Sequence, residues 1–359
     1  MLTTTHTKLV NFPTQAYTQD LTNIDKSMWL KPLSTADFDA SRDLLPPANY
    51  FVENAEIFGM SNIISSSKNI ACLNNIVFNP VNIDKIIDAS ETCISYEEDK
   101  FIFKTKVVHN LVKAIFIGGH WNFGHWLFNH LARLSYVPEP INDKIFILPA
   151  SLKKNYRGML YEIGLKDENL FFVEPGMLVK VEELLIPQMP WLSPIEGVVL
   201  WSPGAIQKLR KLLKVPQTLY SEADCKVFLT RKNTRWRKLL NEDEIFEKFE
   251  KLGFIRIDAA DLNAAEQIEL GKKTQFLFSP AGANSNFFIS MPSNSLMLES
   301  APPMPNMNVS GAFARACGIQ YSQLIGKPLV DLNKAELNYD YIIADEDISS
   351  AIENFLRLS

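Results

Sequence analysis

A segment rich in histidine, asparagine and tryptophan, GGHWNFGHWLFNHLARL at 118–134, holds three of the chain's five histidines. The spacing predicts one α-helix over this segment, in which each residue advances about 100° around the axis. One face of that helix gathers polar and aromatic side chains, those of Asn122, His125, Trp126, Asn129 and Arg133. The opposite face is apolar and suits a protein core. Because Lys and Glu usually cover an exposed helix face, this one is expected to contact a ligand.

The histidines of this segment allow three interpretations. His125 suits general-base chemistry, because an imidazole with an ordinary pKa of about 6.5 exchanges protons near neutral pH. A metal site would need His120, His125 and His130 to converge, whereas a spacing of five residues sets helical neighbours about 140° apart. In the third interpretation the histidines only form hydrogen bonds inside a core. The helical phasing favours the first, with Asn122 and Asn129 beside His125.

A second candidate site is a basic loop, within FLTRKNTRWRKLLN at 228–241, where a predicted strand ends at Thr230. Five cations follow within eight residues: Arg231, Lys232, Arg235, Arg237 and Lys238. Ligands of doubly wound sheets bind at the carboxyl ends of strands, and guanidinium groups pair well with phosphate oxygens. The segment is therefore either a diphosphate site built on Arg231 and Arg235 or a solvated loop.

The third candidate, FSPAGANSNFF at 278–288, reads as a strand, a turn of small residues and the start of a helix. Small residues let backbone N–H groups approach a ligand, and a helix N-terminus favours anions. With a single glycine, the segment matches neither a Walker loop nor a dinucleotide fingerprint. Together with the basic loop it predicts a diphosphate site with four turn residues: Gly282, Ala283, Asn284 and Asn286. Glu299, which ends the next predicted strand, is either a ribose ligand or a surface carboxylate.

Alternating strands and helices must position these segments. The second half predicts strands at 226–230, 254–257, 275–279 and 296–299, and helices at 204–213, 241–252, 264–272, from 286, at 309–317 and at 345–356. The first half predicts strands at 75–78, 100–106, 114–117, 144–148, 170–173 and 183–186, and a helix at 156–163. This alternation is typical of α/β folds with parallel, doubly wound sheets. Asn241 and Glu244 predict a capping box at the helix start.

Length and composition narrow the function classes. A chain of 359 residues favours two domains, and its 47% hydrophobic and 21% charged residues are typical of soluble globular proteins. The net charge of −5 argues against a general affinity for nucleic acids or anionic membranes. The four cysteines form no CxxC pair, which favours free thiols in a reducing compartment. With neither a secretory-signal pattern nor a run of about 18 apolar residues, the sequence predicts a cytoplasmic protein, and peripheral membrane association stays open.

In this order and spacing, the three segments resemble the glycosyltransferase 61 family. The matching stretches are NFGHWLFNHLARL at 122–134, LTRKNTRWRKLLNEDE at 229–244, PAGANSNFFISMPSNSLMLES at 280–300 and DYIIADEDI at 340–348. The resemblance implies a GT-B architecture, with two Rossmann-like, doubly wound domains facing a central cleft. It also implies an acceptor-side domain at 1–195, a nucleotide-sugar-binding domain at 196–340 and a C-terminal helix at 341–359 that braces the first domain.

The resemblance assigns roles by position. The matching residues are His125 for the motif histidine, Arg231 and Arg235 for the loop arginines, Gly282 for the turn glycine and Glu299 for the acidic strand end. Two departures stand out. Asn129 replaces the usual Asp, which removes a carboxylate beside the imidazole. Ala281-Gly282-Ala283-Asn284 replaces the usual His-Gly-Ala-Gly turn, which removes one hydrogen-bond donor near the diphosphate.

The function implied is inverting transfer of a sugar, without an obligatory metal or a cofactor, from a nucleotide sugar to a capsule-like polysaccharide or glycolipid precursor. His125 would deprotonate the acceptor beside Asn122 and Asn129. The acceptor would also contact three further residues: His120, Trp126 and Arg133. The donor would contact the loop and turn, with residues Thr230, Arg231, Arg235, Gly282, Ala283, Asn284 and Asn286, and Glu299 would hold its ribose.

Two other function classes stay open. Asn129 and Ala281 suggest a non-catalytic protein that binds a nucleotide sugar or a glycan on a degenerate transferase scaffold. The three histidines suggest a metal-dependent hydrolase, which would carry metal after purification and lose activity with a chelator.

Overall fold

The computed structural model describes residues 2–4, 8–9, 49–58, 63–66, 69–72, 93–97, 100–104, 107–187, 189–192, 200–217, 224–302, 309–329 and 339–356. Their fold divides into two compact units, one ending at Ala205 and the other running from Ile206. The sequence boundary expected at 195/196 falls close to this division. The strand expected at 75–78 lies outside the described residues.

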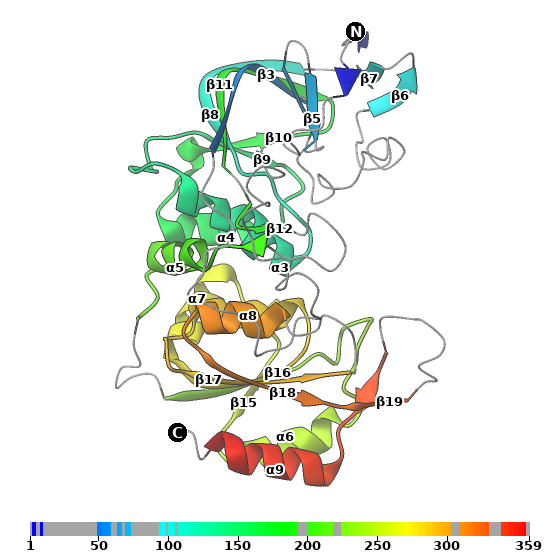
Figure 1. Ribbon diagram of the computed structural model, residues 1–359, viewed down its shortest axis with the longest axis vertical. Helices are drawn as coiled ribbons and strands as arrows, with labels where there is room; N and C mark the ends of the chain where they lie inside the picture. Colours follow the sequence, from blue (N-terminus) through cyan, green and yellow to red (C-terminus); the bar gives the residue numbers. More distant parts are fainter. Residues whose placement is uncertain are drawn as a thin grey trace, which may run out of the picture. The chain divides into compact units, whose positions relative to one another are not determined.

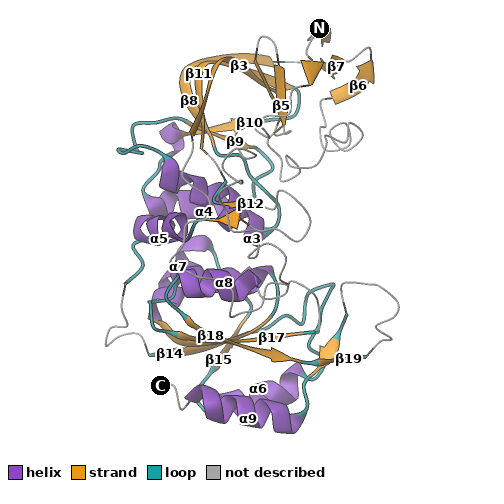
Figure 2. Cartoon of the chain, in the orientation of Figure 1, coloured by secondary structure: helices purple, strands orange, loops and turns teal. Residues whose placement is uncertain are grey.

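The second unit is built on a five-stranded sheet in which every neighbouring pair is parallel. Its strands, in spatial order, are β15 (Ile255–Ile257), β14 (Cys225–Leu229), β16 (Thr274–Pro280), β17 (Leu296–Ala301) and β18 (Gln320–Ile325). Helices α7 (Ala264–Lys273) and α8 (Val309–Ala316) cover one face of the sheet, and α6 (Glu242–Glu250) and α9 (Asp345–Leu356) cover the other (Figures 1 and 2). This arrangement confirms the predicted doubly wound α/β fold for this unit.

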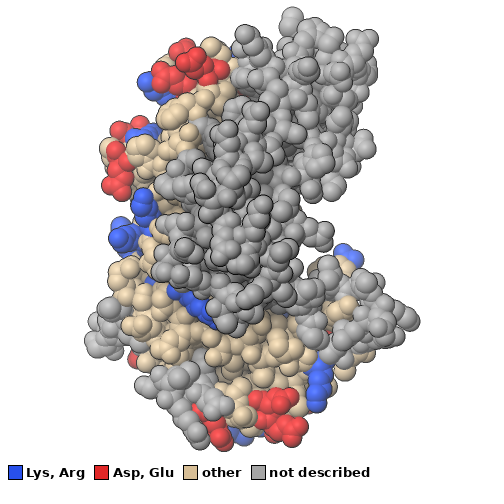
Figure 3. Space-filling model, in the orientation of Figure 1, with Lys and Arg blue, Asp and Glu red and all other residues tan. Residues whose placement is uncertain are grey.

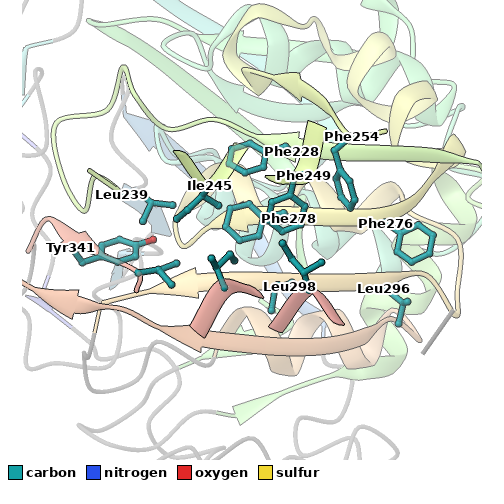
Figure 4. Close-up of a cluster of buried hydrophobic side chains, with 13 residues drawn as sticks. Phe228, Leu239, Ile245, Phe249, Phe254, Phe276, Phe278, Leu296, Leu298 and Tyr341 are labelled. Carbon is teal, nitrogen blue, oxygen red and sulfur yellow. The ribbon is translucent and has the colours of Figure 1, made fainter. Parts of the chain in front are cut away.

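Aromatic side chains fill the core beneath this sheet (Figure 4). The rings of Phe228 on β14 and Phe278 on β16 stack with centroids 4.6 Å apart. Phe249 on α6 packs on Phe278, with centroids 4.7 Å apart. Strands buried on both faces need such continuous apolar runs, which explains why FLFS and VFL stand out in the sequence.

The last helix, α9, belongs to this same core. Its residues Ile348 and Ile352 are buried against the aromatic cluster, and Lys248 of α6 pairs with Asp345 at a distance of 2.8 Å. The helix expected to brace the first domain therefore packs on the sheet of the second unit.

The expected capping box on α6 is absent. The side chain of Asn241 instead bridges to the backbone of Ile343, donating to its carbonyl at 2.7 Å and accepting from its N–H at 3.2 Å. A capping box does occur on α7, where Asn263 and Glu266 bond each other's backbone N–H groups. A long-range partner thus competes successfully with the local capping bond of Asn241.

The first unit contains an eight-stranded mixed sheet. Its spatial order is β10 (Leu170–Val173), β9 (Phe146–Pro149), β8 (Val107–Phe116), β11 (Met177–Pro187), β3 (Asn49–Phe58), β4 (Ile63–Ser66), β5 (Asn69–Cys72) and β2 (Lys8–Leu9). The first four strands are mutually parallel, whereas β3, β4 and β5 pair antiparallel. The predicted doubly wound pattern therefore holds for one part of this sheet only.

Short elements complete the described chain. Helices α4 (Lys154–Ile163) and α5 (Pro203–Leu212) match their predicted positions, and η5 (Asp167–Asn169) and η6 (Ala259–Asp261) are single turns. A three-stranded sheet has the order β1 (Leu2–Thr4), β7 (Lys100–Lys104) and β6 (Cys93–Glu97). One two-stranded sheet pairs β12 (Trp191–Leu192) with β13 (Leu200–Trp201), and another pairs β19 (Lys327–Pro328) with β20 (Tyr341–Ile342). Among the described residues, none of the helices combines the length and apolarity that crossing a membrane requires.

The segment after β8 departs most from its prediction. Instead of one α-helix over 118–134, it forms one α-helical turn, α3 (Phe123–His125), then a π-helical stretch, η3 (Trp126–His130), and a 3₁₀ stretch, η4 (Leu131–Tyr136). These three forms turn by different angles per residue. A phasing that assumes about 100° throughout therefore misplaces the later side chains.

Candidate functional site

The first candidate site is a histidine cluster, formed by His120, His125 and His130 just beyond the carboxyl end of β8. Close packing fixes the backbone that leads into it. A Cβ atom on Gly119 would lie 2.7 Å from Cγ of Pro149 on β9, so only glycine fits there. Gly118 has a φ angle of 67°, a conformation that also favours glycine.

Asn122 and Asn129 orient His125. The Oδ1 atom of Asn122 caps α3 by accepting from the backbone N–H of Gly124 at 2.9 Å and of His125 at 3.3 Å. The Nδ1 atom of His125 lies 3.0 Å from Oδ1 of Asn129. Because an amide oxygen accepts, Nδ1 of His125 carries the hydrogen, and its Nε2 atom presents a lone pair. That is the tautomer a general base requires.

His120 has the complementary tautomer. Its Nδ1 atom accepts the backbone N–H of Asn122 at 2.9 Å, so its Nε2 atom carries the hydrogen. Burial lowers the pKa of His120 to about 4, and the neighbouring His125 adds to the shift. His120 is therefore neutral near pH 7 and offers a hydrogen-bond donor at Nε2.

His130 is fully buried, and its ring stacks with that of His120. Its Nδ1 atom lies 2.9 Å from the carbonyl oxygen of Ile117, and burial, followed by the charge of Arg133, lowers the pKa of His130 well below its ordinary value. The ring centroid of His120 is 4.7 Å from that of His125 and 6.3 Å from that of His130. The prediction that helical phasing separates the three histidines is therefore wrong, because His120 precedes the helix and η3 is π-helical.

The structure gathers these imidazoles without assembling a metal site. In the part of the chain that the structure describes, no group of three or more His, Cys, Asp or Glu side chains is placed to hold a metal ion. The Nδ1 atoms of the three histidines each have a protein hydrogen-bond partner instead.

Three residues predicted to face a ligand or acceptor are buried. Trp126, Asn129 and Arg133 are 0%, 3% and 1% exposed. The indole of Trp126 stacks on the ring of Tyr156, with centroids 6.2 Å apart, and Nε of Arg133 donates to the carbonyl of Asn129 at 3.1 Å. Their burial does not fit the prediction that this face contacts a ligand directly, whereas Asn129 does lie beside His125 as expected. The exposed aromatic beside the cluster is Trp121, which the helical phasing did not single out.

The second candidate site is an arginine cluster in the second unit, formed by Arg231, Arg237, Glu242, Glu299 and Tyr341. It begins at the carboxyl ends of β14 and β16. The chain runs from β14 outward to β15 on one side and returns to β16 on the other, so the topological switch point lies between β14 and β16. In open α/β sheets that crevice is where ligands bind.

Arg231 and Gly282 meet at this switch point. A Cβ atom on Gly282 would lie 1.6 Å from Nη1 of Arg231, so the guanidinium rests directly on the glycine. The predicted pairing of the basic loop with the small-residue turn is confirmed by this contact. The glycine is required by the close approach of the guanidinium, since its backbone is extended, with a φ angle of 163°.

A buried carboxylate holds the start of the basic loop. Glu242, at the first position of α6, is 1% exposed and accepts from the backbone N–H of Arg231 at 3.0 Å and from the hydroxyl of Thr230. Nη2 of Arg231 donates to the carbonyl of Trp236 at 3.3 Å. Sequence reasoning missed Glu242, because an acidic residue at a helix start is usually explained by the helix dipole alone.

The two arginines of this cluster sit in an unfavourable environment. Burial lowers the pKa of Arg231, and the charge of Arg237 lowers it further. Burial also lowers the pKa of Arg237, while Glu299 opposes that shift. Guanidinium groups stay protonated in proteins, so two positive charges remain close together there, and the carboxylates of Glu242 and Glu299 offset part of their repulsion. An anionic ligand would relieve this repulsion.

Arg235 lies apart from this pair. Its guanidinium carbon is 4.5 Å from the centroid of the Trp236 ring, and both side chains are exposed. The structure therefore brings Arg237, and not Arg235, into the environment of Arg231. The spacing of arginines in a loop could not distinguish the two, because the chain turns sharply at Arg237, where φ is 57°.

Glu299 is fully buried within β17, which excludes the surface-carboxylate interpretation. Its Oε2 atom accepts from the hydroxyl of Tyr321 at 2.7 Å and from Nε2 of Gln323 at 3.3 Å. Burial raises the pKa of Glu299, whereas the hydrogen bond from Tyr321 lowers it. Sequence reasoning missed Tyr321, which lies on an unpredicted strand, β18.

The turn after β16 continues into a 3₁₀ helix, η7 (Ala283–Ser290). The carbonyl of Gly282 accepts from the backbone N–H of Ser285 at 3.1 Å. The backbone N–H groups before Ser285 therefore lie ahead of the first hydrogen bond within this helix, at its N-terminal end. Asn284 is partly exposed at this end. Asn286 is buried, and its amide donates to the carbonyl of Ala283 at 3.0 Å. Asn284 is therefore better placed than Asn286 to contact a ligand.

Comparison with known proteins identifies the family. A search of curated proteins found no match. The model of the family described as Glycosyltransferase 61 matches residues 123–298. The matched region begins just after Asn122, includes His125, Arg231 and Gly282, and ends one residue before Glu299. Residues 123–298 of this chain are therefore a region of the glycosyltransferase 61 family.

Proposed function

We propose that this protein is an inverting, metal-independent glycosyltransferase of GT-B architecture. It would act in the cytoplasm, moving a sugar from a nucleotide sugar to a cell-surface polysaccharide or glycolipid precursor. The observation that carries the proposal is the contact of Arg231 with Gly282 at the switch point of a parallel sheet. A cation held against a small-residue turn at that edge suits a diphosphate.

The arginine cluster would bind the donor diphosphate. When the bond between the anomeric carbon and the diphosphate breaks, negative charge develops on the leaving group. Arg231 and Arg237 would supply fixed positive charge where this charge appears, and preorganised charge of this kind lowers the barrier. Backbone N–H groups at Ala283 and Asn284 would add donors. Figure 3 shows basic side chains interspersed with acidic ones on the described part of one face.

Glu299 would hold the ribose of the donor. Its Oε2 atom is occupied by Tyr321 and Gln323. Its buried Oε1 atom has no hydrogen-bond partner among the residues that the structure describes, so a ribose hydroxyl would donate to Oε1. Arg235 takes a lesser part in this proposal, because its guanidinium rests on the exposed Trp236 ring.

The histidine cluster would activate the acceptor. Nε2 of His125 would take the proton of an acceptor hydroxyl, whose oxygen forms a bond to the anomeric carbon on the face opposite the diphosphate. The Nε2–H group of His120 would donate a hydrogen bond to the same oxygen. Attack from the opposite face inverts the anomeric centre, and the diphosphate leaves with the electron pair of the broken bond.

A second candidate function is favoured by Asn129. Its amide fixes the tautomer of His125 but cannot stabilise an imidazolium as a carboxylate does. A protein that binds a nucleotide sugar or a glycan without transferring the sugar is consistent with that substitution.

A donor screen tests both functions. Nucleotide diphosphates and their sugars are screened by thermal shift, since a ligand at about 100 times Kd adds about 2.7 kcal/mol of stability. Donors that bind are then assayed for hydrolysis and transfer, with His125→Ala as the comparison variant. We expect binding by both proteins and a loss of turnover of about 10²–10⁴-fold in the variant. Binding without turnover would support the second function. No binding by any nucleotide would exclude the transferase and the nucleotide-sugar-binding form of the second function, and would leave only a glycan-binding protein.

A further inference from the structure

The largest exposed aromatic surface beside the histidine cluster belongs to Trp121. Its side chain lies in the loop between β8 and α3 and is 73% exposed. A single exposed apolar residue is ordinary on a protein surface and carries no conclusion alone. The position of Trp121 is informative because both its ring and its backbone are held in place.

The ring of Trp121 is supported from below by the cluster itself. It stacks on the imidazole of His120, with centroids 5.4 Å apart and an interplanar angle of 27°. His120 in turn contacts the ring of His125, and its own Nδ1 atom is fixed by the backbone N–H of Asn122. One face of the indole is thus occupied by protein, while most of the side chain remains accessible.

The backbone of Trp121 is held by a buried tyrosine. The hydroxyl of Tyr156 on α4 donates to the carbonyl oxygen of Trp121 at 3.1 Å. The ring of Tyr156 packs between Phe123 and Trp126, with centroids 5.4 and 6.2 Å away. A rigid aromatic surface loses little conformational entropy when a ligand covers it.

We propose that the indole of Trp121 is a stacking platform for a pyranose ring of the acceptor. This inference rests on the proposed function and sharpens it, because it makes the acceptor a carbohydrate and not a simple lipid alcohol. A sugar ring presents C–H groups on its faces and hydroxyls at its rim. The C–H groups suit the electron-rich face of an indole. The hydroxyls would then lie beside Nε2 of His120 and of His125, two atoms with complementary donor and acceptor roles.

Binding can be tested without any enzymatic turnover. The full-length protein is labelled with 5-fluorotryptophan, and the fluorine resonance of Trp121 is assigned by its absence from Trp121→Phe. The probes are methyl glycosides of glucose, galactose, mannose and N-acetylglucosamine, and glycerol is the control polyol. We expect at least one glycoside to shift the Trp121 resonance in a saturable way, whereas glycerol does not. If all four glycosides leave that resonance in place, the platform does not exist.

Kinetics provide the second arm once a donor is known. Trp121→Ala should raise the KM for an acceptor glycoside about tenfold and lower the ratio of transfer to donor hydrolysis. Trp121→Tyr, which keeps an aromatic face, should recover most of that loss. Phe51→Ala removes an aromatic side chain on β3 that is 78% exposed, and it should leave both quantities unchanged.

The outcomes separate this inference from the proposed function. An unchanged KM in Trp121→Ala, or a loss that Trp121→Tyr does not recover, would overturn the platform while leaving the transferase intact. A protein that binds no nucleotide would overturn the proposed function, and the fluorine measurement would still decide whether Trp121 contacts a sugar.

Discussion

The histidine cluster and the arginine cluster are assembled by different means. The three histidines come from one stretch of 11 residues, 120–130, positioned by an irregular helix. The arginine cluster joins residues from 231 to 341, which come from the loop after β14, helix α6 and strands β17 and β20. The two clusters also differ in charge. Burial keeps the imidazoles of His120 and His130 neutral, whereas the guanidinium groups stay charged. A neutral site suits a hydroxyl, and a cationic one suits a diphosphate.

The largest effect should come from removing the buried cation. Arg231→Ala should weaken the binding of a nucleoside diphosphate about 100-fold, because it removes two charge-assisted hydrogen bonds to the phosphates. Isothermal titration measures this change. Arg235→Ala is the matched control in the same loop, and its effect should be no more than about threefold, since its guanidinium rests on Trp236. Equal losses in the two variants would mean that burial does not decide which arginine binds.

A smaller effect should follow from displacing the same guanidinium. In Gly282→Ala the new methyl group would occupy the position of Nη1 of Arg231, which lies only 1.6 Å from it. The end of an arginine side chain can move at little cost, so Tm should stay close to that of the wild type. The affinity for the nucleoside diphosphate should fall about tenfold. A large drop in Tm with unchanged affinity would make the glycine structural and not part of a donor site.

The histidine cluster offers an effect in the opposite direction. Asn129→Asp replaces the amide that faces Nδ1 of His125 with a carboxylate, which stabilises the imidazolium formed during proton removal. We expect kcat to rise about fivefold and the acidic limb of its pH profile to move to higher pH. Asn129→Ala, which leaves Nδ1 without this acceptor, should lower kcat. If both variants lower kcat equally, residue 129 serves the packing of η3 and not the tautomer of His125.

The same contrast explains what could be predicted from the sequence. The arginine cluster follows from regular strands and helices, whose periods are known, so the contact between Arg231 and Gly282 could be anticipated. The choice of Arg237 over Arg235 could not, because it depends on a left-handed residue within a loop. The histidine cluster was misjudged because the chain leaves α-helical geometry at Trp126. The winding then changes twice, to π at Trp126 and to 3₁₀ at Leu131, so a single helical period could not place Arg133. Trp121 precedes α3, and a helical phasing of the whole segment could not place it.

The smallest expected effect concerns stability and pH. Burial lowers the pKa of His120 to about 4 from an ordinary value of 6.5, and His130 shifts in the same direction. Between these pH values the unfolded chain binds more protons than the folded one, so the free energy of unfolding decreases as pH falls through this window. Calorimetry at about pH 7 and about pH 5 should show Tm falling by a few degrees. His120→Gln removes one of the two groups, so its Tm should fall less over the same interval. If the Tm of His120→Gln falls as steeply with pH as the Tm of the wild type, then His120 is protonated at similar pH in the folded and unfolded states. In that case burial does not hold His120 neutral.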